Sequence, residues 1–308
     1  HDDKTPSLVV TPDKGLWHCM GACQKGGTVV DWTMWRSGVS FRHAIALLRG
    51  GAGASAENAA PKRATTRKLS PLAEGGASDA ELLGRVVRLY HDTLNQHPEG
   101  KGYLSSRGLE HPELIDHFQL GYANRTLGYR LPHSQTQLGA RLRGRLVELG
   151  VYRQSGHEFL SGSLVVPLFD EEGGIASLYG RKVQEHHREG TPKHLYLPGG
   201  HRGVFNRAAL AESEEAILCE ALFDAMTFWC AGYRNVTSAY GVEGFTDEIA
   251  QALAAAKVRR VKIAFDRDEA GDRGAERVAR KLEALGMETF RVVFPRGMDA
   301  NEYARKVA

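Results

Sequence analysis

The sequence predicts an α/β protein with three parts, the last of which is a parallel sheet with covering helices. From residue 214 onward, short apolar runs typical of strands alternate with stretches of helical periodicity, which is the pattern of a parallel sheet. A basic segment of mixed α and β character precedes it, since residues 121–210 contain 12 Lys and Arg against 7 Asp and Glu. The first 50 residues are a small unit with two closely spaced cysteines.

Composition excludes several classes of protein. The 308 residues are 42% hydrophobic and 25% charged, ordinary values for a globular chain of two or three domains. No run of 18 or more apolar residues is present, so we expect no membrane span. The opening "HDDKTPSL" has no apolar signal-peptide region, which argues against a secreted protein. Four cysteines are too few for a disulfide framework, which favours the cytoplasm. The net charge of +3 mildly favours a polyanionic partner.

Residues 1–50 predict two strands and two helices. The strands are expected in "PSLVVTP" and "GLWHCM", on either side of a turn at residues 13–15. The helices are expected in "TVVDWTMWRSG" and "SFRHAIALLRG", each closed by glycine. Residues 51–80 are rich in Ala, Gly, Ser and Pro and cannot bury a core, so we expect a flexible linker there.

The next segment, 81–211, begins with an amphipathic helix for which Asp79 is the predicted cap. Its apolar face consists of Leu82, Leu83, Val86, Val87, Tyr90 and Leu94. Further on, "SLVVPLFD" and "IASLYGRKV" predict a pair of strands joined by the acidic turn "DEEGG".

The final segment, 212–308, predicts four strands alternating with three helices. The strands are expected at 216–220, 235–241, 260–266 and 287–294, and the helices at 223–231, 247–256 and 270–285. Cys219 and Cys230 fall within these elements and are expected to be core thiols, a common fate of free cysteine.

Carboxylates follow two of these strands. Glu220 ends one strand and Asp224 lies one helical turn later, while Asp266 ends another strand and Asp268 follows it. If the two strands are neighbours, the four carboxylates converge at the sheet edge where open α/β sheets bind ligands. Like charges so close together favour a cation, and Mg²⁺ prefers such hard oxygen ligands. Two such ions could stabilise both oxygens of an in-line displacement.

Each carboxylate also has a purely structural explanation. Glu220 alone could be a satisfied carboxylate at a helix start, and the acids of "DRDEAGD" would favour a helix N-terminus. Their occurrence together at matching strand ends favours a metal site. Asp299, in "RGMDANEY" after the last strand, is equally well explained as an outer metal ligand or as a helix cap.

The spacing of these residues resembles the toprim fold. That fold is shared by bacterial-type primases, type IA and II topoisomerases, old-type nucleases and recombination mediators of the RecR kind. The resemblance implies that the catalytic residues are Glu220, Asp224, Asp266 and Asp268. It implies that the ligands of catalytic Mg²⁺ or Mn²⁺ are Glu220, Asp266, Asp268 and Asp299.

Longer segments resemble the DnaG-type DNA primases, in the order of that family. The run "YLSSRGLEHPELIDHFQLGYA" is similar to the opening of their polymerase domain, and "SLVVPLFDEEGGIASLYGRKV", "TPKHLYLPGG" and "HRGVFN" to its basic half. The runs "AFDRDEAGDRGA" and "FPRGMDANEY" resemble its toprim half. The resemblance implies a CHC2-like, zinc-ribbon-like unit at 1–50, a basic mixed α+β subdomain at 81–211 and a toprim parallel-sheet domain at 212–308.

In the basic half, the resemblance implies that Arg181, Lys193 and Arg202 bind nucleotide and template. Cations suit this role because phosphates carry the charge of both ligands, and arginine offers a planar fork to phosphate oxygens. For any one of these residues, a solvated surface charge is the alternative.

The chain departs from the family pattern at several positions. Arginines that usually precede "VVPL" are replaced by Ser161 and Ser163, and a Tyr and an Asn after "TPK" are replaced by His194 and Tyr196. Ala221 stands where the family has Gly after the glutamate, which restricts the backbone. These changes suggest a divergent branch, such as a phage or mobile-element primase. Three other arginines could compensate electrostatically for the missing ones: Arg141, Arg143 and Arg145. A solvated, exposed helix face explains them at least as well.

Cys19 and Cys23 lie in a Gly-rich turn that suits a metal, a disulfide or a redox pair. In the CHC2 pattern, Cys-x-x-His precedes a hairpin and a second Cys pair, and His1 matches that His. The resemblance therefore implies a structural Zn²⁺ site of His1, Cys19 and Cys23, with its fourth ligand three positions before residue 1. The family pair is usually separated by two residues, whereas three intervene here. His18 is expected to be an exposed strand residue.

The resemblance implies a DNA primase, a nucleotidyltransferase that makes short RNA primers from NTPs on single-stranded DNA in DNA replication. The alternatives are a toprim nuclease and a non-catalytic DNA-binding protein of the recombination-mediator kind. The intact Glu220, Asp266 and Asp268 argue against the non-catalytic protein. A replicative helicase stays open as a partner, because no docking region is visible. The chain ends soon after its last predicted strand, as expected of a fragment or a minimal primase.

Overall fold

The computed structural model describes residues 5–39, 41, 44–45, 47–48, 72, 77–184 and 190–307. His1, most of the predicted linker 51–80 and part of the second short helix lie outside the described residues. The chain forms two compact units: unit 1 comprises residues 1–97 and 121–164, and unit 2 comprises residues 98–120 and 165–308. The predicted segment 81–211 is therefore shared between both units. Among the described residues, no helix has the length and apolar character needed to cross a membrane.

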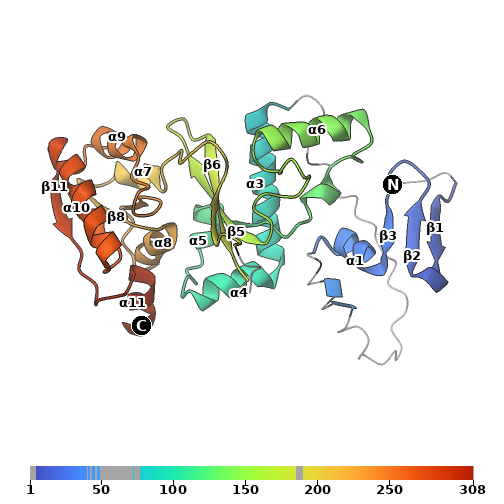
Figure 1. Ribbon diagram of the computed structural model, residues 1–308, viewed down its shortest axis with the longest axis horizontal. Coiled ribbons are helices and arrows are strands. Elements are labelled where there is room, and N and C mark those ends of the chain that lie inside the picture. The colour runs from blue at the N-terminus through green and yellow to red at the C-terminus, as the bar shows by residue number, and fades with distance from the viewer. Residues whose placement is uncertain are drawn as a thin grey trace. The chain divides into compact units, whose positions relative to one another are not determined.

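Unit 1 begins with a three-stranded antiparallel sheet (Figure 1). β1 (Leu8–Thr11) pairs with β2 (Leu16–Cys19), and β2 pairs with β3 (Gly26–Thr28). A single 3-10 turn (Pro12–Lys14) joins the first two strands, and Gly15 closes it at φ 61°, a left-handed conformation that suits glycine. The two predicted strands are confirmed. β3 was not predicted, because Gly-Gly-Thr carries no alternation of apolar and polar residues.

Helix α1 (Val29–Ser37) follows, and its caps explain its bounds. The hydroxyl of Thr28 accepts a hydrogen bond from the Asp31 N–H, and the Thr28 N–H donates to the Asp31 carboxylate at 2.8 Å. This capping box satisfies two N–H groups that the first turn would leave unpaired. Gly38 ends the helix at φ 64°. The helix predicted from the sequence is confirmed.

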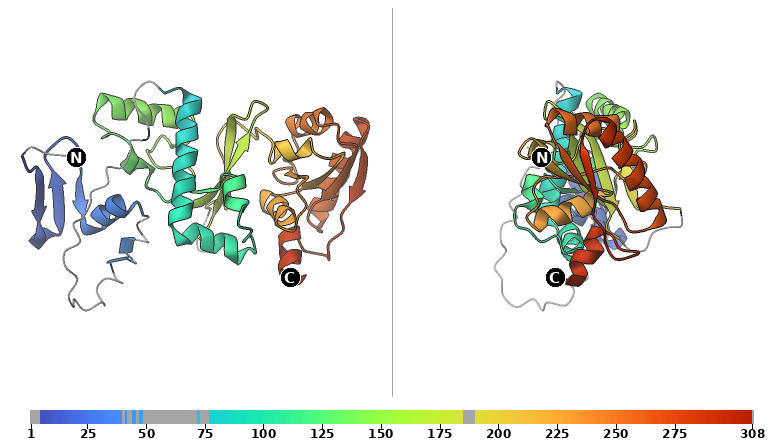
Figure 2. Two further views of the ribbon diagram at one scale, coloured as in Figure 1. Left: turned by 180° about the vertical axis from the view of Figure 1, so that it is seen from behind. Right: turned by 90° about the vertical axis from the view of Figure 1, so that its left-hand side faces the viewer.

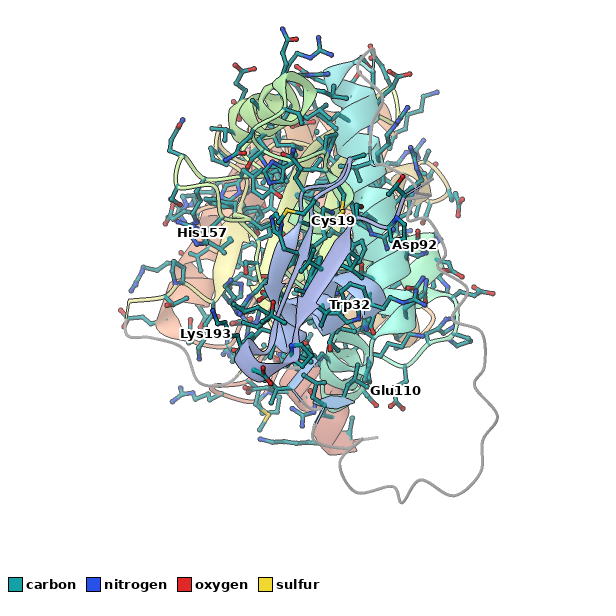
Figure 3. The ribbon with its side chains drawn as sticks, turned by 90° about the vertical axis from the view of Figure 1, so that its right-hand side faces the viewer. Cys19, Trp32, Asp92, Glu110, His157 and Lys193 are labelled. Carbon is teal, nitrogen blue, oxygen red and sulfur yellow. The ribbon has the colours of Figure 1, made fainter. Side chains whose placement is uncertain are left out.

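An aromatic cluster packs α1 against β2. The Trp17 ring meets Trp32 edge-to-face at 4.9 Å and stacks on Trp35 at 5.7 Å, and such pairs contribute roughly 0.5–1.5 kcal/mol each beyond burial. The Trp17 indole N–H donates to the Thr28 carbonyl at 3.0 Å. Cys19 lies two residues along the same strand and therefore on the same face, within this small unit (Figure 3). The cluster thus fixes the strand that carries one of the predicted zinc ligands.

Helix α3 (Asp79–Gln96) has the predicted apolar face, all six residues of which are buried. Its predicted cap is wrong: Ser78, not Asp79, accepts the Glu81 N–H at 3.2 Å, and the Ser78 N–H donates to the Glu81 carboxylate. Asp79 instead accepts a hydrogen bond from Arg145 at 2.7 Å. The other elements of unit 1 are β4 (Gly121–Tyr122), a 3-10 helix (Leu127–Arg130) and α6 (Gln137–Glu148).

A buried carboxyl group lies inside unit 1. Glu158, which is 7% exposed, accepts hydrogen bonds from the Leu127 N–H at 3.0 Å and from the Tyr90 hydroxyl at 3.2 Å. Burial raises the pKa of Glu158 to about 7, although both hydrogen bonds and the charge of Arg125 act in the opposite direction. The folded chain therefore holds a proton on Glu158 more firmly than the unfolded chain does.

Unit 2 contains an antiparallel hairpin that the sequence predicts. The hairpin consists of β5 (Ser163–Phe169, which begins in unit 1) and β6 (Ile175–Lys182), and β7 (His194–Tyr196) follows it. Two helices of unit 2 precede the hairpin in the chain: α4 (Pro98–Ser106) and α5 (Leu114–His117). The turn after β5 forms because the Asp170 side chain accepts the N–H groups of Glu172 and Gly174. β6 pairs with β7 so that Arg181 lies opposite His194.

The rest of unit 2 is the predicted parallel sheet. Its strands, in the spatial order β11-β10-β8-β9, are β8 (Glu215–Cys219), β9 (Val236–Ser238), β10 (Arg260–Ala264) and β11 (Glu288–Arg291). Its helices are α7 (Arg207–Leu210), α8 (Leu222–Cys230), α9 (Asp247–Ala255), α10 (Glu269–Ala284) and α11 (Ala300–Val307). Right-handed crossovers in this order place α8 and α10 on opposite faces of the sheet (Figure 2).

The order in which strands are added to the sheet reverses between β8 and β10. The chain leaves β8 toward β9 on one side, whereas β10 and β11 lie on the other side. β8 and β10 pair in parallel with Cys219 opposite Ala264, so Glu220 and Asp266 follow neighbouring strand ends. Open α/β sheets bind ligands at such a switch point. The strand adjacency that the carboxylate prediction requires is confirmed.

Replacing Glu158 with Gln should change how stability depends on pH. The folded-state pKa of about 7 exceeds the ordinary value of 4.5, so the stabilisation is complete below pH 4.5 and is lost as the pH rises through 7. This shift corresponds to about 3 kcal/mol of unfolding free energy. Glu158→Gln removes the titration, so the free-energy difference between variant and wild type, from urea unfolding, should change by about that amount.

The exposed Glu148 of α6 supplies a matched control for this experiment. Glu148→Gln should follow the wild-type pH profile, because no buried proton is removed. Parallel profiles for the wild type and Glu158→Gln would contradict the assignment of the proton to Glu158.

Candidate active site

The carboxyl edge of the parallel sheet carries the predicted carboxylates. The Glu220 carboxylate accepts a hydrogen bond from the Asp266 N–H at 3.3 Å, which joins the ends of β8 and β10 directly. The Gly241 N–H donates to the Glu220 carbonyl at 2.7 Å and so joins the end of β9 as well. Burial raises the pKa of the half-buried Glu220 to about 7, and the charges of Asp266 and Asp268 act in the same direction.

Asp266 and Asp268 lie on the turn between β10 and α10. Burial raises the pKa of Asp266 to about 6, with contributions from Asp299 and Asp268. The Asp268 carboxylate accepts the Gly271 N–H at 2.7 Å and is the N-cap of α10, so its structural and its proposed metal-binding roles coexist. Gly271 is required here, because a Cβ atom would lie 2.3 Å from the Asp266 carbonyl oxygen.

Asp299 is brought to the same edge by a backbone clasp. The Gly297 N–H donates to the Arg267 carbonyl at 3.0 Å, and the Arg267 N–H donates to the Met298 carbonyl at 3.2 Å. The Asp299 carboxylate accepts the Glu302 N–H at 2.6 Å, which is the cap that the sequence offered as an alternative. Asp299 also raises the pKa of the carboxylates around it, so it is both a cap and a member of the cluster.

Asp224 differs from the other carboxylates because it is only 3% exposed. It accepts the Asn301 N–H at 3.2 Å, and burial raises its pKa well above the usual range, with the charge of Asp299 adding to the effect. The Asn301 side chain donates to the Arg107 carbonyl and to the Thr227 hydroxyl, both at 2.8 Å. Asp224 therefore links α8 to the start of α11, next to Asp299 of the carboxylate cluster.

A cavity of about 420 Å³ in unit 2 combines acidic and basic groups. Its acidic lining is Glu220, Asp224, Asp266 and Asp299, and its basic lining is Arg107 and Arg181. Tyr179, Tyr196 and Tyr240 supply aromatic walls. Sequence reasoning placed Arg181 here but missed Arg107, because neither periodicity nor spacing distinguishes that arginine from a surface charge.

Three side chains orient Arg181. Its Nε donates to the Tyr103 hydroxyl at 3.0 Å, and its terminal nitrogen contacts the His194 ring. A guanidinium only donates, so the ring nitrogen that faces it accepts, and Nδ1 then donates to the Tyr179 hydroxyl at 2.8 Å. Burial lowers the pKa of His194 to about 4, and the charge of Arg181 adds to the effect, so the ring is neutral.

The other predicted cations lie apart from this cavity. Lys193 (Figure 3) and Arg202 are exposed and do not line it. In unit 1, Arg143 donates to the carbonyls of Pro132, Gly139 and Gly128, and Arg145 is paired with Asp79. Arg143 and Arg145 are therefore engaged in holding the fold rather than free to compensate for missing arginines.

The departure at Ala221 causes no backbone strain. Ala221 is the N-cap of α8 with φ −117° and ψ 158°, an extended conformation that any residue adopts. A glycine is therefore not required after Glu220. Close packing requires a glycine at a different position, Gly271 in the first turn of α10.

The carboxylate cluster suits a divalent metal ion. Among the described residues, no three His, Cys, Asp or Glu side chains converge into a complete ligand group. Mg²⁺ does not need one, since it usually binds one or two carboxylates together with waters and substrate phosphates. Glu220 and Asp266 could provide these carboxylates: burial first, and the neighbouring carboxylates second, raise their pKa values, and a cation would offset both effects.

The predicted zinc ligands of unit 1 are described in part. Cys19 is 4% exposed, and the hydroxyl of Ser7 lies 3.6 Å from its sulfur. Burial acts to raise the pKa of each thiol, and the pKa of Cys23 is raised overall. In Cys19, hydrogen bonds with Cys23 and Ser7 outweigh burial, so its pKa is lowered. A lowered thiol pKa suits thiolate ligation of zinc. His18 is exposed, as expected, and His1 lies outside the described residues.

Comparisons with known proteins agree with this geometry. A family model for a Toprim-like domain matches residues 217–304, and a model for a CHC2 zinc finger matches residues 1–64. The DNA primase of Aquifex aeolicus is 26% identical over 99% of this chain and 59% of its own length. The DNA primase of Halalkalibacterium halodurans is 28% identical over 99% of this chain and 51% of its own length. The chain is similar in sequence to these DNA primases over nearly its whole length.

Solved structures of DnaG-type primases share the fold. The zinc-binding and RNA polymerase domains of the Aquifex aeolicus primase superpose with a TM-score of 0.63 at 23% identity, covering 99% of this chain and 73% of that one. A DnaG catalytic domain bound to ssDNA superposes with a TM-score of 0.62 at 22% identity, covering 74% of this chain and 76% of that one. The predicted α/β class with a zinc-ribbon unit and a toprim sheet is confirmed. Zinc and a divalent metal are the cofactors that these two domains imply.

Two substitutions of Asp268 should separate its structural role from its charge. Asp268→Ala removes the cap of α10 and should lower the unfolding free energy by about 1 kcal/mol relative to Asp268→Asn, which keeps a capping oxygen. Both variants remove the same negative charge from the cluster, so the repulsion that is relieved cancels in the comparison. Urea unfolding without divalent metal measures the difference, and equal stabilities would show that the cap contributes nothing.

Proposed function

We propose that this chain is a DNA primase, which synthesises short RNA primers from nucleoside triphosphates on a single-stranded DNA template. The chain spans 59% and 51% of the length of the two relatives described above, so the activity is proposed for these domains themselves. The reaction class is divalent-metal-dependent nucleotidyl transfer. A replicative helicase is left outside the proposal, and the place of action is the cytoplasm.

The cavity that joins the carboxylates to Arg107 and Arg181 carries the proposal. Nucleotidyl transfer requires a place where triphosphate oxygens meet cations while a hydroxyl attacks the α-phosphorus. Carboxylates alone would repel a triphosphate, and arginines alone would bind it without assisting the reaction. The combination at a switch point of a parallel sheet supports both needs within one cavity.

Within this proposal, Glu220 and Asp266 hold a divalent ion, with Asp268 and Asp299 as outer ligands. When bound, the ion neutralises phosphate charge and orients the reacting groups. Arg181, held by Tyr103 and His194, directs its guanidinium to phosphate oxygens, and the neutral His194 adds no competing charge. Asp224 keeps the start of α11 in place through its hydrogen bond to Asn301.

Template contacts are proposed for the exposed cations and for the N-terminal unit. Lys193 and Arg202 are free to meet the sugar–phosphate backbone, whose affinity depends on such charges. A structural zinc ion would be held by Cys19 and Cys23, with His1 as the third ligand that the family pattern implies. The resident divalent ion of the active site is proposed to be Mg²⁺, with Mn²⁺ as a substitute.

Primer synthesis tests the proposal directly. Wild-type protein should convert labelled NTPs into short RNA on several single-stranded DNA templates in the presence of Mg²⁺ or Mn²⁺, as seen on a denaturing gel. Asp266→Asn should lower the yield by about a hundredfold or more, because a charged ligand at the reacting phosphate is lost. Asp247→Asn, in an exposed carboxylate at the start of α9, is the matched control and should remain active.

Two results would overturn the proposal. The first is the absence of RNA from wild-type protein on every template. The second is degradation of labelled DNA that requires Asp266, since this outcome would make the same carboxylates the centre of a nuclease.

Arg181→Lys should weaken priming although it keeps the positive charge. Lysine lacks the fork that reaches both the Tyr103 hydroxyl and the His194 ring, so its ammonium is less well oriented. We expect primer yield at subsaturating NTP to fall about tenfold, with partial recovery at high NTP. Arg273→Lys, on the exposed surface of α10, should have no effect. Full activity of Arg181→Lys would show that charge alone suffices at this position.

A further inference from the structure

Arg291 lies outside the cavity of the candidate active site, yet its side chain contacts the turn that carries the metal-binding aspartates. It is the last residue of β11, the edge strand of the parallel sheet, and it pairs with Ile263 of β10. Its guanidinium donates to the carbonyl of Phe265 at 2.8 Å and to the carbonyl of Asp266 at 2.9 Å. A longer contact of 3.3 Å reaches the carbonyl of Ile263.

These contacts replace a strand where the sheet ends. β10 ends at Ala264, so the carbonyls of Phe265 and Asp266 lie beyond the last ladder partner that β11 supplies through its backbone. Phe265 is fully buried, and a buried carbonyl without a partner would be costly. The planar fork of arginine can reach both carbonyls at once, which the point charge of lysine cannot do.

A second contact ties Arg291 to helix α10. The nitrogen that donates to the Asp266 carbonyl, Nη2, also donates to the Asp272 carboxylate at 3.0 Å, and Arg267 donates to the same carboxylate at 3.0 Å. The Asp272 N–H in turn donates to the Asp268 carbonyl at 2.9 Å, within the first turn of α10. Arg291 therefore grips the turn from both ends, at the Asp266 backbone and, through Asp272, at the helix that Asp268 caps.

The side chain is placed where the carboxylate cluster needs restraint. Asp266 and Asp268 are like charges two residues apart on this turn, and the Glu220 carboxylate accepts the Asp266 N–H, so a cation beside the turn is favourable. Arg291 is 23% exposed, so its charge is only partly screened by solvent. The guanidinium both offsets the repulsion and fixes the backbone to which the carboxylates are attached.

We propose that Arg291 is a positioning residue that holds Asp266 and Asp268 in the arrangement that binds the divalent ion. The inference deepens the proposed function and rests on its metal site. Outer groups that orient metal ligands typically change metal affinity by about 10–100-fold when they are removed. Arg291 donates to the backbone carbonyl of Asp266 and does not line the cavity, whereas Arg107 and Arg181 do.

Direct measurement of Mn²⁺ binding tests this role without any primer synthesis. Free Mn²⁺ is followed by electron paramagnetic resonance in the absence of DNA and NTP, at a temperature well below melting. Arg291→Met should weaken Mn²⁺ binding at least tenfold. Arg291→Lys should restore it only in part, because the charge returns without the fork. Arg273→Met, which loses only an exposed pair with Glu269, should bind Mn²⁺ as the wild type does.

The metal-free melting temperature separates positioning from a merely structural effect. The expected result is a loss of Mn²⁺ affinity in a variant that remains folded at the temperature of the measurement. If Arg291→Met does not fold, Arg291→Lys decides: wild-type Mn²⁺ affinity in that variant overturns the proposal, and so does wild-type affinity in a folded Arg291→Met.

Asp266→Asn distinguishes this inference from the proposed function. Wild-type protein that binds Mn²⁺ through Asp266 but makes no primers would overturn the primase proposal and leave the role of Arg291 intact. Equal Mn²⁺ binding by the wild type and Asp266→Asn would remove the metal site and overturn the role of Arg291.

Discussion

Several like-charged carboxylates are partly buried together at the end of the parallel sheet, and this is the constraint that the rest of the candidate site meets. Burial raises the pKa of Glu220 to about 7 and that of Asp266 to about 6, so the folded chain pays a free-energy cost to gather these groups. The structure meets that cost with backbone contacts: Glu220 accepts the Asp266 N–H, and Asp268 accepts the Gly271 N–H. A divalent ion would complete what these contacts begin, and the cluster is therefore better suited to binding metal than to stabilising the fold.

Departures from the family pattern are tolerated where the backbone does not require a particular residue. Ala221 has an extended conformation that needs no glycine, whereas at Gly271 any Cβ atom would lie 2.3 Å from the Asp266 carbonyl oxygen. Near the cations, His194 stands where the family has a tyrosine, and it still presents an acceptor to Arg181 because burial keeps its ring neutral. At His194 a different residue type thus still supplies the hydrogen-bond acceptor that faces Arg181.

Local patterns were sufficient to predict most of the fold and the acidic half of the site. Alternating strands and helices located Glu220 and Asp266 at strand ends, since periodicity depends on near neighbours in the chain. The same reasoning gave the wrong cap for α3, because Ser78 and Asp79 are both good caps and only the long-range contact of Asp79 with Arg145 decides between them. Arg107 and Arg291 were missed for a related reason: their roles depend on side chains that cross to distant segments, and a lone arginine leaves no periodic signal.

The contrast between Asp224 and Arg291 shows how the site divides its tasks. Asp224 was predicted as a catalytic group and lines the cavity, and its buried carboxylate is also hydrogen-bonded to the start of α11. Arg291 was not singled out in the sequence, yet it makes three contacts with backbone carbonyls at the end of β10. Both contact the loops that bear the other carboxylates of the cluster, Asp224 from α8 and Arg291 from the edge strand β11. Such contacts on both flanks stabilise a site made of mutually repelling groups on two loops, because they hold the loops against that repulsion.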